Sequence, residues 1–322
     1  MPSLKEIKNR IASVNSTRKI TSAMKMVASS KLHHAQVQIE KMLPYETLLE
    51  HIVKTFLASD ADVDTVYQRK RSVSKVALVV FASNSSLCGG FNSNVLKLMQ
   101  QAVAEYEHLG KDNVTIYPIG RKVAEKVAKL GLKSAGEFNA LADKPNPQEC
   151  IHIATELGRM YREGEVDKVE LIYHHFKSAG SQILTRKTLL PFDLDTQLEE
   201  DHERDLTSNV VTKKAQEYLK KHKKQEDSRD KEEVKPLNDN FIVEPDMETV
   251  LGVLVPKVIH LAVYTALLDS NASEHAARMV AMQTATDNAD ELLRELNLQY
   301  NKSRQQAITN ELLDIVGGSV NN

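Results

Sequence analysis

The stretch KVIHLAVYTALLDSNASEHAARMVAMQTATDNADELLRELNLQYNKSRQQAITNELLDIV, residues 257–316, decides the fold of this chain. It contains neither glycine nor proline, whereas Pro256 precedes it and Gly317 follows it. Proline near a helix start and glycine after a helix end are common boundary signals, so the stretch predicts one uninterrupted helix. At about 1.5 Å per residue this helix would be roughly 90 Å long, which is too long for the core of a compact domain.

Small and apolar residues recur along this predicted helix in alternating steps of four and three residues. That spacing holds one narrow seam toward a partner helix, as in a coiled coil. The seam positions are Leu261, Thr265, Leu268, Ala272, His275, Met279, Met282, Thr286, Ala289, Leu293, Leu296, Tyr300, Ser303 and Ala307. Near the end the apolar set shifts to Ile308, Leu312 and Ile315, which predicts a drift in register there.

The N-terminal segment carries a matching pattern. Ser3 and Glu6 have the spacing of a capping box, which predicts a helix start. The seam positions here are Leu4, Ile7, Ile11, Val14, Arg18, Thr21, Lys25, Ala28, Leu32, Ala35, Ile39 and Met42. Pro44 is expected to kink or interrupt this helix. The simplest arrangement pairs the two chain ends as an antiparallel coiled coil and inserts the middle of the chain as a separate domain.

The predicted seam is weak, because alanine, threonine and serine bury few methylenes. Arg18, Lys25 and His275 also fall on seam positions. Either the coil frays and its charged side chains snorkel, or a surrounding partner protein stabilises it. The N-terminal segment is basic, which suits an acidic partner better than nucleic acid, since no aromatic residues interleave with the charges. Its basic residues are Lys5, Lys8, Arg10, Arg18, Lys19, Lys25, Lys31 and Lys41, against Glu6 and Glu40.

Composition limits the remaining function classes. The 322 residues carry a net charge of −2, so no polyanionic partner is implied for the whole chain. Cys88 and Cys150 are far apart in sequence and predict free thiols in a reducing compartment. The charged start argues against a signal peptide, and no apolar run is expected to span a membrane. Membrane association is therefore expected only through partner proteins.

The middle of the chain alternates between strand and helix patterns. This alternation predicts an α/β, Rossmann-like sheet with an antiparallel edge. The strands are predicted at 75–81, 113–119, 166–176 and 182–190, and the helices at 93–108, 121–130 and 147–162. The predicted domains are a shaft helix at 1–59, an α/β domain at 70–192, a charged insertion at 193–239, and a short strand with the second shaft helix at 240–322.

The loop NSSLCGGFN, residues 84–92, follows the first strand, where a phosphate would bind in such a fold. It matches neither the dinucleotide glycine pattern nor a P-loop, so its glycines are better explained by a tight turn. A nucleotide-binding α/β enzyme with a coiled-coil arm remains the alternative. The pairs His33-His34 and His174-His175 point apart and do not predict a shared metal. No catalytic, cofactor-binding or metal-binding residue is predicted.

Residues 199–235 hold eleven acidic residues against ten lysines and arginines. This balance predicts a solvated and partly helical insertion, with a docking or regulatory element as the alternative. The segment NFIVEP, residues 240–245, predicts a short strand before the long helix.

Three long motifs then identify a family: RIASVNSTRKITSAMKMVASSK at 10–31, SEHAARMVAMQTATDNA at 273–289 and YNKSRQQAITNELLDIVGG at 300–318. Together with LCGGFN and FIVEP, they make the chain similar to the gamma subunit of bacterial F-type ATP synthases. The resemblance covers nearly the whole chain apart from the charged insertion. It implies a rotor shaft that performs no bond chemistry, binds no cofactor and couples ion-driven c-ring rotation to conformational cycling of the catalytic subunits. A passive coiled-coil spacer is a further hypothesis.

The resemblance also implies partners and a location. The partners are the ring of alpha and beta subunits, the epsilon subunit and the c-ring, on the cytoplasmic face of the bacterial inner membrane. The implied ring-contacting residues are Met24, Lys25, Arg278, Arg304, Gln305, Thr309, Leu312, Ile315 and Val316. The implied foot on the c-ring and epsilon consists of Pro44, Tyr45, Glu46, Glu244 and Pro245.

Two departures from the family pattern stand out. The family often has Asp-Arg-Gly before LCGGFN, where this chain has Asn84-Ser85-Ser86. The insertion lies about where the chloroplast subunit carries regulatory cysteines, but it contains no cysteine. Thiol switching by that route is therefore excluded.

Overall fold

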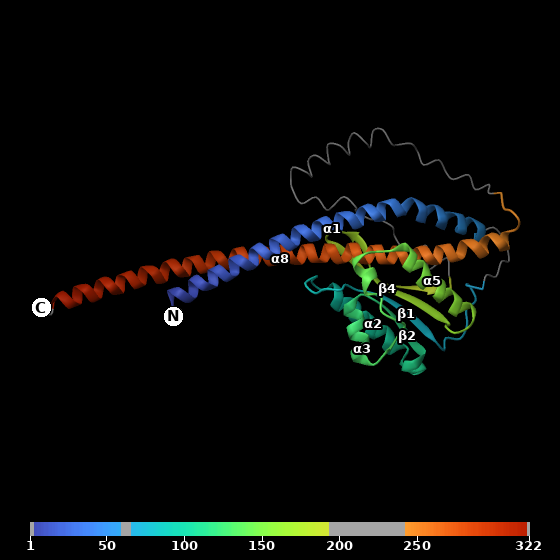
Figure 1. The fold of residues 1–322 in the computed structure, drawn as a ribbon, viewed down its shortest axis with the longest axis horizontal. Helices are drawn as coiled ribbons and strands as arrows, with labels where there is room; N and C mark the ends of the chain where they lie inside the picture. The colour runs from blue at the N-terminus through green and yellow to red at the C-terminus, as the bar shows by residue number, and fades with distance from the viewer. Residues whose placement is uncertain (1–2, 59–65, 193–241, 321–322) are drawn as a thin grey trace, which may run out of the picture. The chain divides into compact units, whose positions relative to one another are not determined.

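The computed structural model describes residues 3–58, 66–192 and 242–320 (Figure 1). The predicted charged insertion, residues 193–239, lies outside this range. The chain divides into two compact units, one formed by Met1–Ser29 with Arg278–Asn322 and the other by Ser30–Ala277. Helices α1 (Leu4–Ala58) and α8 (Met247–Val320) each contribute to both units. We describe each unit by itself.

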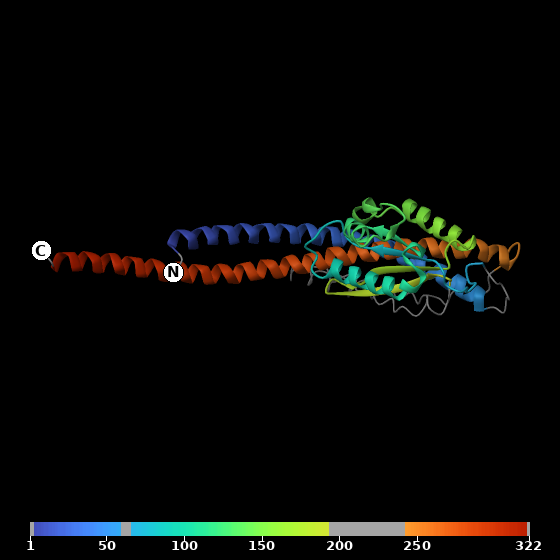
Figure 2. The same cartoon turned by 90° about the horizontal axis from the view of Figure 1, so that it is seen from below.

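The first unit is a pair of antiparallel helical segments. The Arg18 guanidinium lies 2.9 Å from Asp290 Oδ1, and the hydroxyl oxygens of Thr21 and Thr286 are 2.8 Å apart. The later residue of α1 meets the earlier residue of α8, so the two segments run in opposite directions. Figures 1 and 2 show these segments of α1 and α8 side by side in both views. The predicted antiparallel coiled coil is confirmed.

Burial follows the predicted seam in this unit. On α8, Met282, Ala289 and Leu296 are buried, whereas Leu298, two residues farther on, is 71% exposed. On α1 the buried seam positions are Ile7, Thr21 and Ala28. Beyond Ala307 the side chains of Ile308 and Leu312 are exposed. The shifted apolar set at the end of the helix therefore forms no buried seam within the described residues.

The helix starts follow side-chain caps. The capping box is confirmed, since Ser3 N donates to Glu6 Oε2 and Glu6 N donates to Ser3 Oγ. Helix α8 begins at Met247, where Asp246 Oδ1 accepts from the backbone amide of Thr249 at 2.8 Å. The predicted strand at 240–245 is wrong, because its described residues, 242–245, form no strand.

Two prolines lie inside helices. Pro256 lies within α8, so the predicted start of this helix after Pro256 is wrong. Pro44 lies within α1, which continues to Ala58, so of the predicted kink or interruption at Pro44 the structure contradicts the interruption. A proline inside a helix costs about 3 kcal/mol through one lost hydrogen bond and a steric clash. Burial of the neighbouring apolar side chains offsets this cost. Around Pro256 these are Val255, Val258 and Ile259.

The second unit contains a five-stranded sheet with the order β3-β2-β1-β4-β5. The first four strands in this order pair in parallel, and β5 pairs antiparallel with β4. Their bounds are β1 (Val76–Phe81), β2 (Val114–Ile119), β3 (Lys133–Ser134), β4 (Lys168–Ser178) and β5 (Ser181–Leu190). The predicted α/β sheet with an antiparallel edge is confirmed, although the sequence did not predict β3.

Helices cover both faces of this sheet. Alternate residues of β1 point to opposite sides, so Val76, Leu78 and Val80 pack against α2 and α3. Ala77 and Val79 belong to a second core with α5 and with segments of α1 and α8. The helices are α2 (Phe91–Glu105), α3 (Arg121–Leu130), α4 (Asn139–Asp143) and α5 (Pro147–Arg162), with short 3₁₀ helices η1 (Glu107–Leu109) and η2 (Lys111–Asn113).

Among the residues that the structure describes, one helix is long and apolar enough to cross a membrane by length and composition. It is α8, and half of the apolar stretch concerned is buried inside the protein. The expectation that no apolar run reaches spanning length is therefore wrong. A helix that serves as the core of an α/β domain passes the same test, and α8 supplies Val263, Ala266 and Leu267 to the core.

The buried carboxylate of Glu170 binds one hydroxyl and two cationic side chains on one side of the sheet. Glu170 on β4 is 2% exposed and accepts hydrogen bonds from Tyr106, Lys168 and Arg186. Burial alone would raise the pKa of Glu170, but the bonds from Arg186 and Lys168 outweigh it and hold the pKa below its ordinary value.

We expect Glu170→Gln to lower the free energy of unfolding by about 3 kcal/mol at pH 7, because it leaves the partly buried cations Lys168 and Arg186 without their carboxylate. The folded pKa is depressed, so this contribution is complete above the unfolded pKa of about 4.3 and is lost as pH falls through the folded pKa. Denaturant unfolding of both proteins from pH 7 to pH 3 should show the difference shrink. Glu125→Gln, at an exposed pair, is the control; a pH-independent difference at Glu170 would contradict this account.

The seam of the first unit gives a second test. Leu296→Ala should reduce stability by about 2 kcal/mol, since it removes a side chain that is only 3% exposed. Leu298→Ala, on the same helix and 71% exposed, should change stability by less than about 0.5 kcal/mol. Thermal unfolding followed by circular dichroism compares the two variants, and equal losses would rule out the seam.

Candidate functional site

The N-terminal part of α1 carries an exposed apolar stripe. Ile20, Met24 and Val27 are all exposed and lie at i, i+4 and i+7, which places them on one side of the helix. This side differs from the seam that contains Thr21 and Ala28. Contiguous apolar surface of this kind usually marks contact with another protein. Met24 therefore lies where the sequence predicted a partner contact, and Lys25 beside it is half-buried.

The other predicted ring-contacting residues lie on α8. Arg304, Gln305 and Thr309 are exposed, and the Thr309 hydroxyl donates to the Gln305 carbonyl at 2.9 Å. Leu312 is exposed, and Arg278 is half-buried. The backbone at Ile315 and Val316 is helical, but their side chains lie outside those that the structure describes.

The predicted foot residues divide by exposure. Pro44 and Tyr45 are exposed on α1, and Leu48 extends their surface by one turn. Glu46 is buried and does not share that surface. Glu244 and Pro245 are exposed just before α8 begins. Among the described hydrogen bonds and ion pairs, none connects the Pro44–Tyr45 part of the predicted foot with the Glu244–Pro245 part.

The other candidate site is the carboxyl edge of the sheet. The strand order reverses between β1 and β4, and ligands in such folds bind in the crevice at that point. The loop after β1 closes on itself there. The Ser83 backbone amide donates to Asn92 Oδ1 at 3.1 Å, and Asn92 Nδ2 donates to Cys88 Sγ at 3.1 Å. Cys88 is a buried free thiol, so its burial argues against a role as an exposed nucleophile.

The neighbouring loop groups are also engaged within the protein. Asn84 Oδ1 accepts from the backbone amide of Arg121 at 2.8 Å, and the Arg121 guanidinium donates to the Asn84 carbonyl at 2.7 Å. Asn84 Nδ2 donates to Asp143 at 2.7 Å. A phosphate needs amide or guanidinium donors directed outward, and these donors point to protein oxygens.

Helix α8 occupies the rest of this edge. Asn271 Nδ2 donates to the Ala142 carbonyl at 2.9 Å, and Ser273 Oγ donates to the His174 carbonyl at 3.1 Å. The His174 ring stacks on Phe91, and burial lowers its pKa to about 4, so it is neutral near pH 7. Among the residues described, no group of three or more histidine, cysteine or acidic side chains could hold a metal ion.

Leu87 in the same loop was not predicted as a special position. Its φ is +67°, a left-handed value that non-glycine residues rarely adopt, and its side chain is 61% exposed. Gly89, with φ of +58°, follows. Leucine carries no sequence signal for this conformation, so only the structure reveals an apolar side chain held outward at the loop tip.

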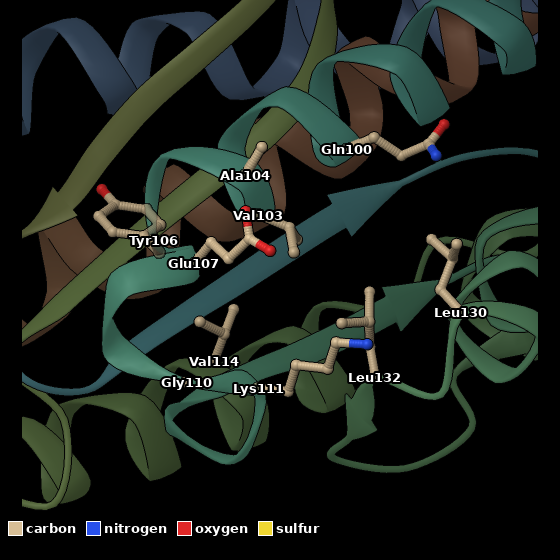
Figure 3. A pocket seen from close by; sticks show the side chains of 10 residues that line it. All are labelled: Gln100, Val103, Ala104, Tyr106, Glu107, Gly110, Lys111, Val114, Leu130 and Leu132. Carbon is tan, nitrogen blue, oxygen red and sulfur yellow. The ribbon is translucent and has the colours of Figure 1, made fainter.

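A cavity of about 220 Å³ lies at the opposite, amino edge of the sheet (Figure 3). Its walls include Val103, Val114 and Leu132, with Glu107 and Lys111 among the polar lining residues. Ligand sites usually measure 300–1,000 Å³ and converge several polar groups. This cavity falls below that range, which gives no support to a nucleotide site.

The sequence is similar to a known protein family over nearly its whole length. Residues 3–320 match the family model described as ATP synthase. The ATP synthase gamma chain of Phocaeicola vulgatus is 53% identical over 99% of this chain and 100% of its own length. That of Bacteroides thetaiotaomicron is 51% identical over 99% and 100%, and that of Flavobacterium johnsoniae is 39% identical over 99% and 98%.

Solved structures share the fold. The central stalk of the Tetrahymena thermophila mitochondrial ATP synthase gives a TM-score of 0.54 at 24% identity, with 83% of this chain and 99% of that chain covered. The rotor of the Euglena gracilis mitochondrial ATP synthase gives 0.55 at 18% identity, with 95% and 98% covered. With a family model that spans nearly the whole chain and relatives above 50% identity over their full length, this chain belongs to the ATP synthase gamma chain family.

Proposed function

We propose that this chain is the central rotor shaft of an F-type ATP synthase. It couples ion-driven rotation of the c-ring to conformational cycling of the catalytic subunits in a ring of alpha and beta subunits. The observation that carries this proposal is the antiparallel helix pair of the first unit, which buries a thin seam and leaves apolar side chains such as Ile20 and Met24 exposed. An exposed stripe on a paired helix requires a surrounding partner.

The shaft acts by binding rather than by chemistry. Each catalytic subunit that binds one face of the shaft more tightly biases the rotation angle, and the angle in return biases nucleotide affinity, because coupling between two sites is reciprocal. The closed loop at Ser83–Asn92 and the protein-bound Arg121 support a non-catalytic subunit of the complex. In the part of the chain that the structure describes, the loop donors bonded to protein oxygens argue against the nucleotide-binding alternative.

The proposed contacts are those that the family resemblance implies. The ring-contacting set that we propose is Met24, Lys25, Arg278, Arg304, Gln305, Thr309, Leu312, Ile315 and Val316. The proposed foot toward the c-ring and epsilon is Pro44, Tyr45, Glu244 and Pro245, with Glu46 acting from a buried position. The complex associates with the membrane through the c-ring, and we place the chain on the cytoplasmic face of the bacterial inner membrane. Burial of half of the apolar stretch of α8 supports attachment through partners.

Removing residues 308–322 should lower ion-driven ATP synthesis by tenfold or more while the α/β domain keeps its melting temperature. A tenfold loss corresponds to about 1.4 kcal/mol of coupling, within the usual range for linked sites. Proteoliposomes containing the reconstituted complex provide the synthesis assay. The control is removal of residues 318–322 alone, which should preserve most of the activity. A purified full chain that fails to associate with an alpha–beta ring would overturn the proposed function.

Titration calorimetry separates the shaft from the enzyme hypothesis. We expect the isolated chain to bind ATP and NAD with a Kd weaker than about 1 mM, because the loop donors are bonded within the protein. Micromolar binding of either nucleotide would favour the enzyme with a coiled-coil arm. A variant with Asn84→Ala frees the backbone amide of Arg121 from Asn84 Oδ1 but keeps the guanidinium bonds to the carbonyl of residue 84, so it checks whether the amide bond is what excludes phosphate.

A further inference from the structure

Helix α8 carries a run of buried polar side chains where it crosses the α/β domain. Asp269 and Ser273 are 0% exposed, and Asn271 is buried as well. Apolar residues are the usual occupants of such positions, and a buried polar group that loses its partner costs about 1–3 kcal/mol. Each of the three residues is therefore stable in this position only while its hydrogen bond is kept.

Two of these residues bond to strand β4. The Nδ1 atom of His175 lies 2.7 Å from Asp269 Oδ2, and because a carboxylate oxygen only accepts, Nδ1–H is the donor. Ser273 Oγ donates to the His174 carbonyl at 3.1 Å. Asp269 and Ser273 are one helical turn apart, about 40° around the helix axis, so both bonds leave α8 on the same side.

The third residue bonds on the other side. Asn271 Nδ2 donates to the carbonyl of Ala142, in α4, at 2.9 Å. Asn271 lies about 200° around the helix from Asp269 and about 160° from Ser273. One short segment of α8 is thus bonded to the α/β domain on two opposite sides within the second unit.

We propose that Asp269, Asn271 and Ser273 form a torsional clamp that stops α8 from turning about its own axis against the α/β domain. Resting on the proposed function, the clamp lets torque applied at the domain pass into the helix instead of being lost as slip. Rotation of α8 in either direction pulls on both sides of the clamp at once. Helix α8 continues from this segment to Val320.

Directional bonds suit this task better than apolar packing. Apolar contact is non-directional, so its energy changes gradually when a helix turns by a small angle. A hydrogen bond weakens steeply once its angle falls below about 120°, and in the interior no water replaces it. The clamp residues are therefore positioning residues, whose effect on rotation should exceed their effect on stability.

The test compares clamp variants with a packing variant. The clamp variants are Asn271→Leu with Ser273→Ala, and separately Asp269→Leu. Asp269→Asn is the conservative variant, because its amide oxygen still accepts from His175 Nδ1–H. Leu267→Ala is the control, because Leu267 is buried on the same helix. The control and the clamp variants are compared after their melting temperatures have been measured, each at the same interval below its own.

The first measurement uses the assembled complex with the ring immobilised. A bead is attached through Lys129→Cys, which is exposed on α3, while Cys88 and Cys150 are buried. We expect the angular variance of the bead in a stalled state to rise at least twofold in the clamp variants and to stay near the wild-type value in Asp269→Asn and Leu267→Ala. An unchanged variance, or an equal rise in Leu267→Ala, would overturn the clamp.

The second measurement uses the free full-length chain. Spin labels at Val253→Cys and Lys129→Cys report the distance between α8 and the α/β domain, with Cys88 and Cys150 replaced by alanine. The distance distribution should broaden in the clamp variants and not in Leu267→Ala; an unchanged width would sink the proposal. If the wild-type chain does not assemble with the ring, the proposed function fails, and the distance distribution still decides the clamp.

Discussion

Burial of α8 is the constraint on which the rest of this structure depends. Along residues 258–276 the helix is buried around most of its circumference, because it is a core helix of the α/β domain. Along the first unit it is buried only on a seam that includes Met282, Ala289 and Leu296. One helix therefore serves as domain core and as half of a thin two-helix rod, and its composition changes from apolar to small and polar along its length.

Much of this followed from periodicity. Local patterns of burial appear in the sequence as the spacing of apolar residues. This spacing predicted the seam positions, the buried strand at Val76–Phe81 and the strands β4 and β5. Pro256 predicted a helix start that the structure does not have, because a local helix-breaking signal loses to the burial of the residues around it. Strand β3 has two exposed residues and no apolar pattern, so its position depends on β2 alone.

Part of the candidate site could also be predicted from the sequence. Met24 and Leu312 were predicted as ring contacts from family motifs, and both side chains are exposed. The bonds of Arg121 to Asn84 and of Asn271 to Ala142 join residues 37 and 129 positions apart. Spacing along one element cannot reveal such pairs, since they depend on how the loops meet at the edge of the sheet.

The threonine and alanine seam has a geometric consequence. Helices that meet through small side chains approach each other more closely than helices that meet through leucines, so the pair is slender. Thr21 and Thr286 touch through hydroxyls, and Ala28 and Ala289 fill little volume. A helix pair of small diameter can be enclosed closely by a surrounding protein. On its own, the same pair resists bending less than a thicker one.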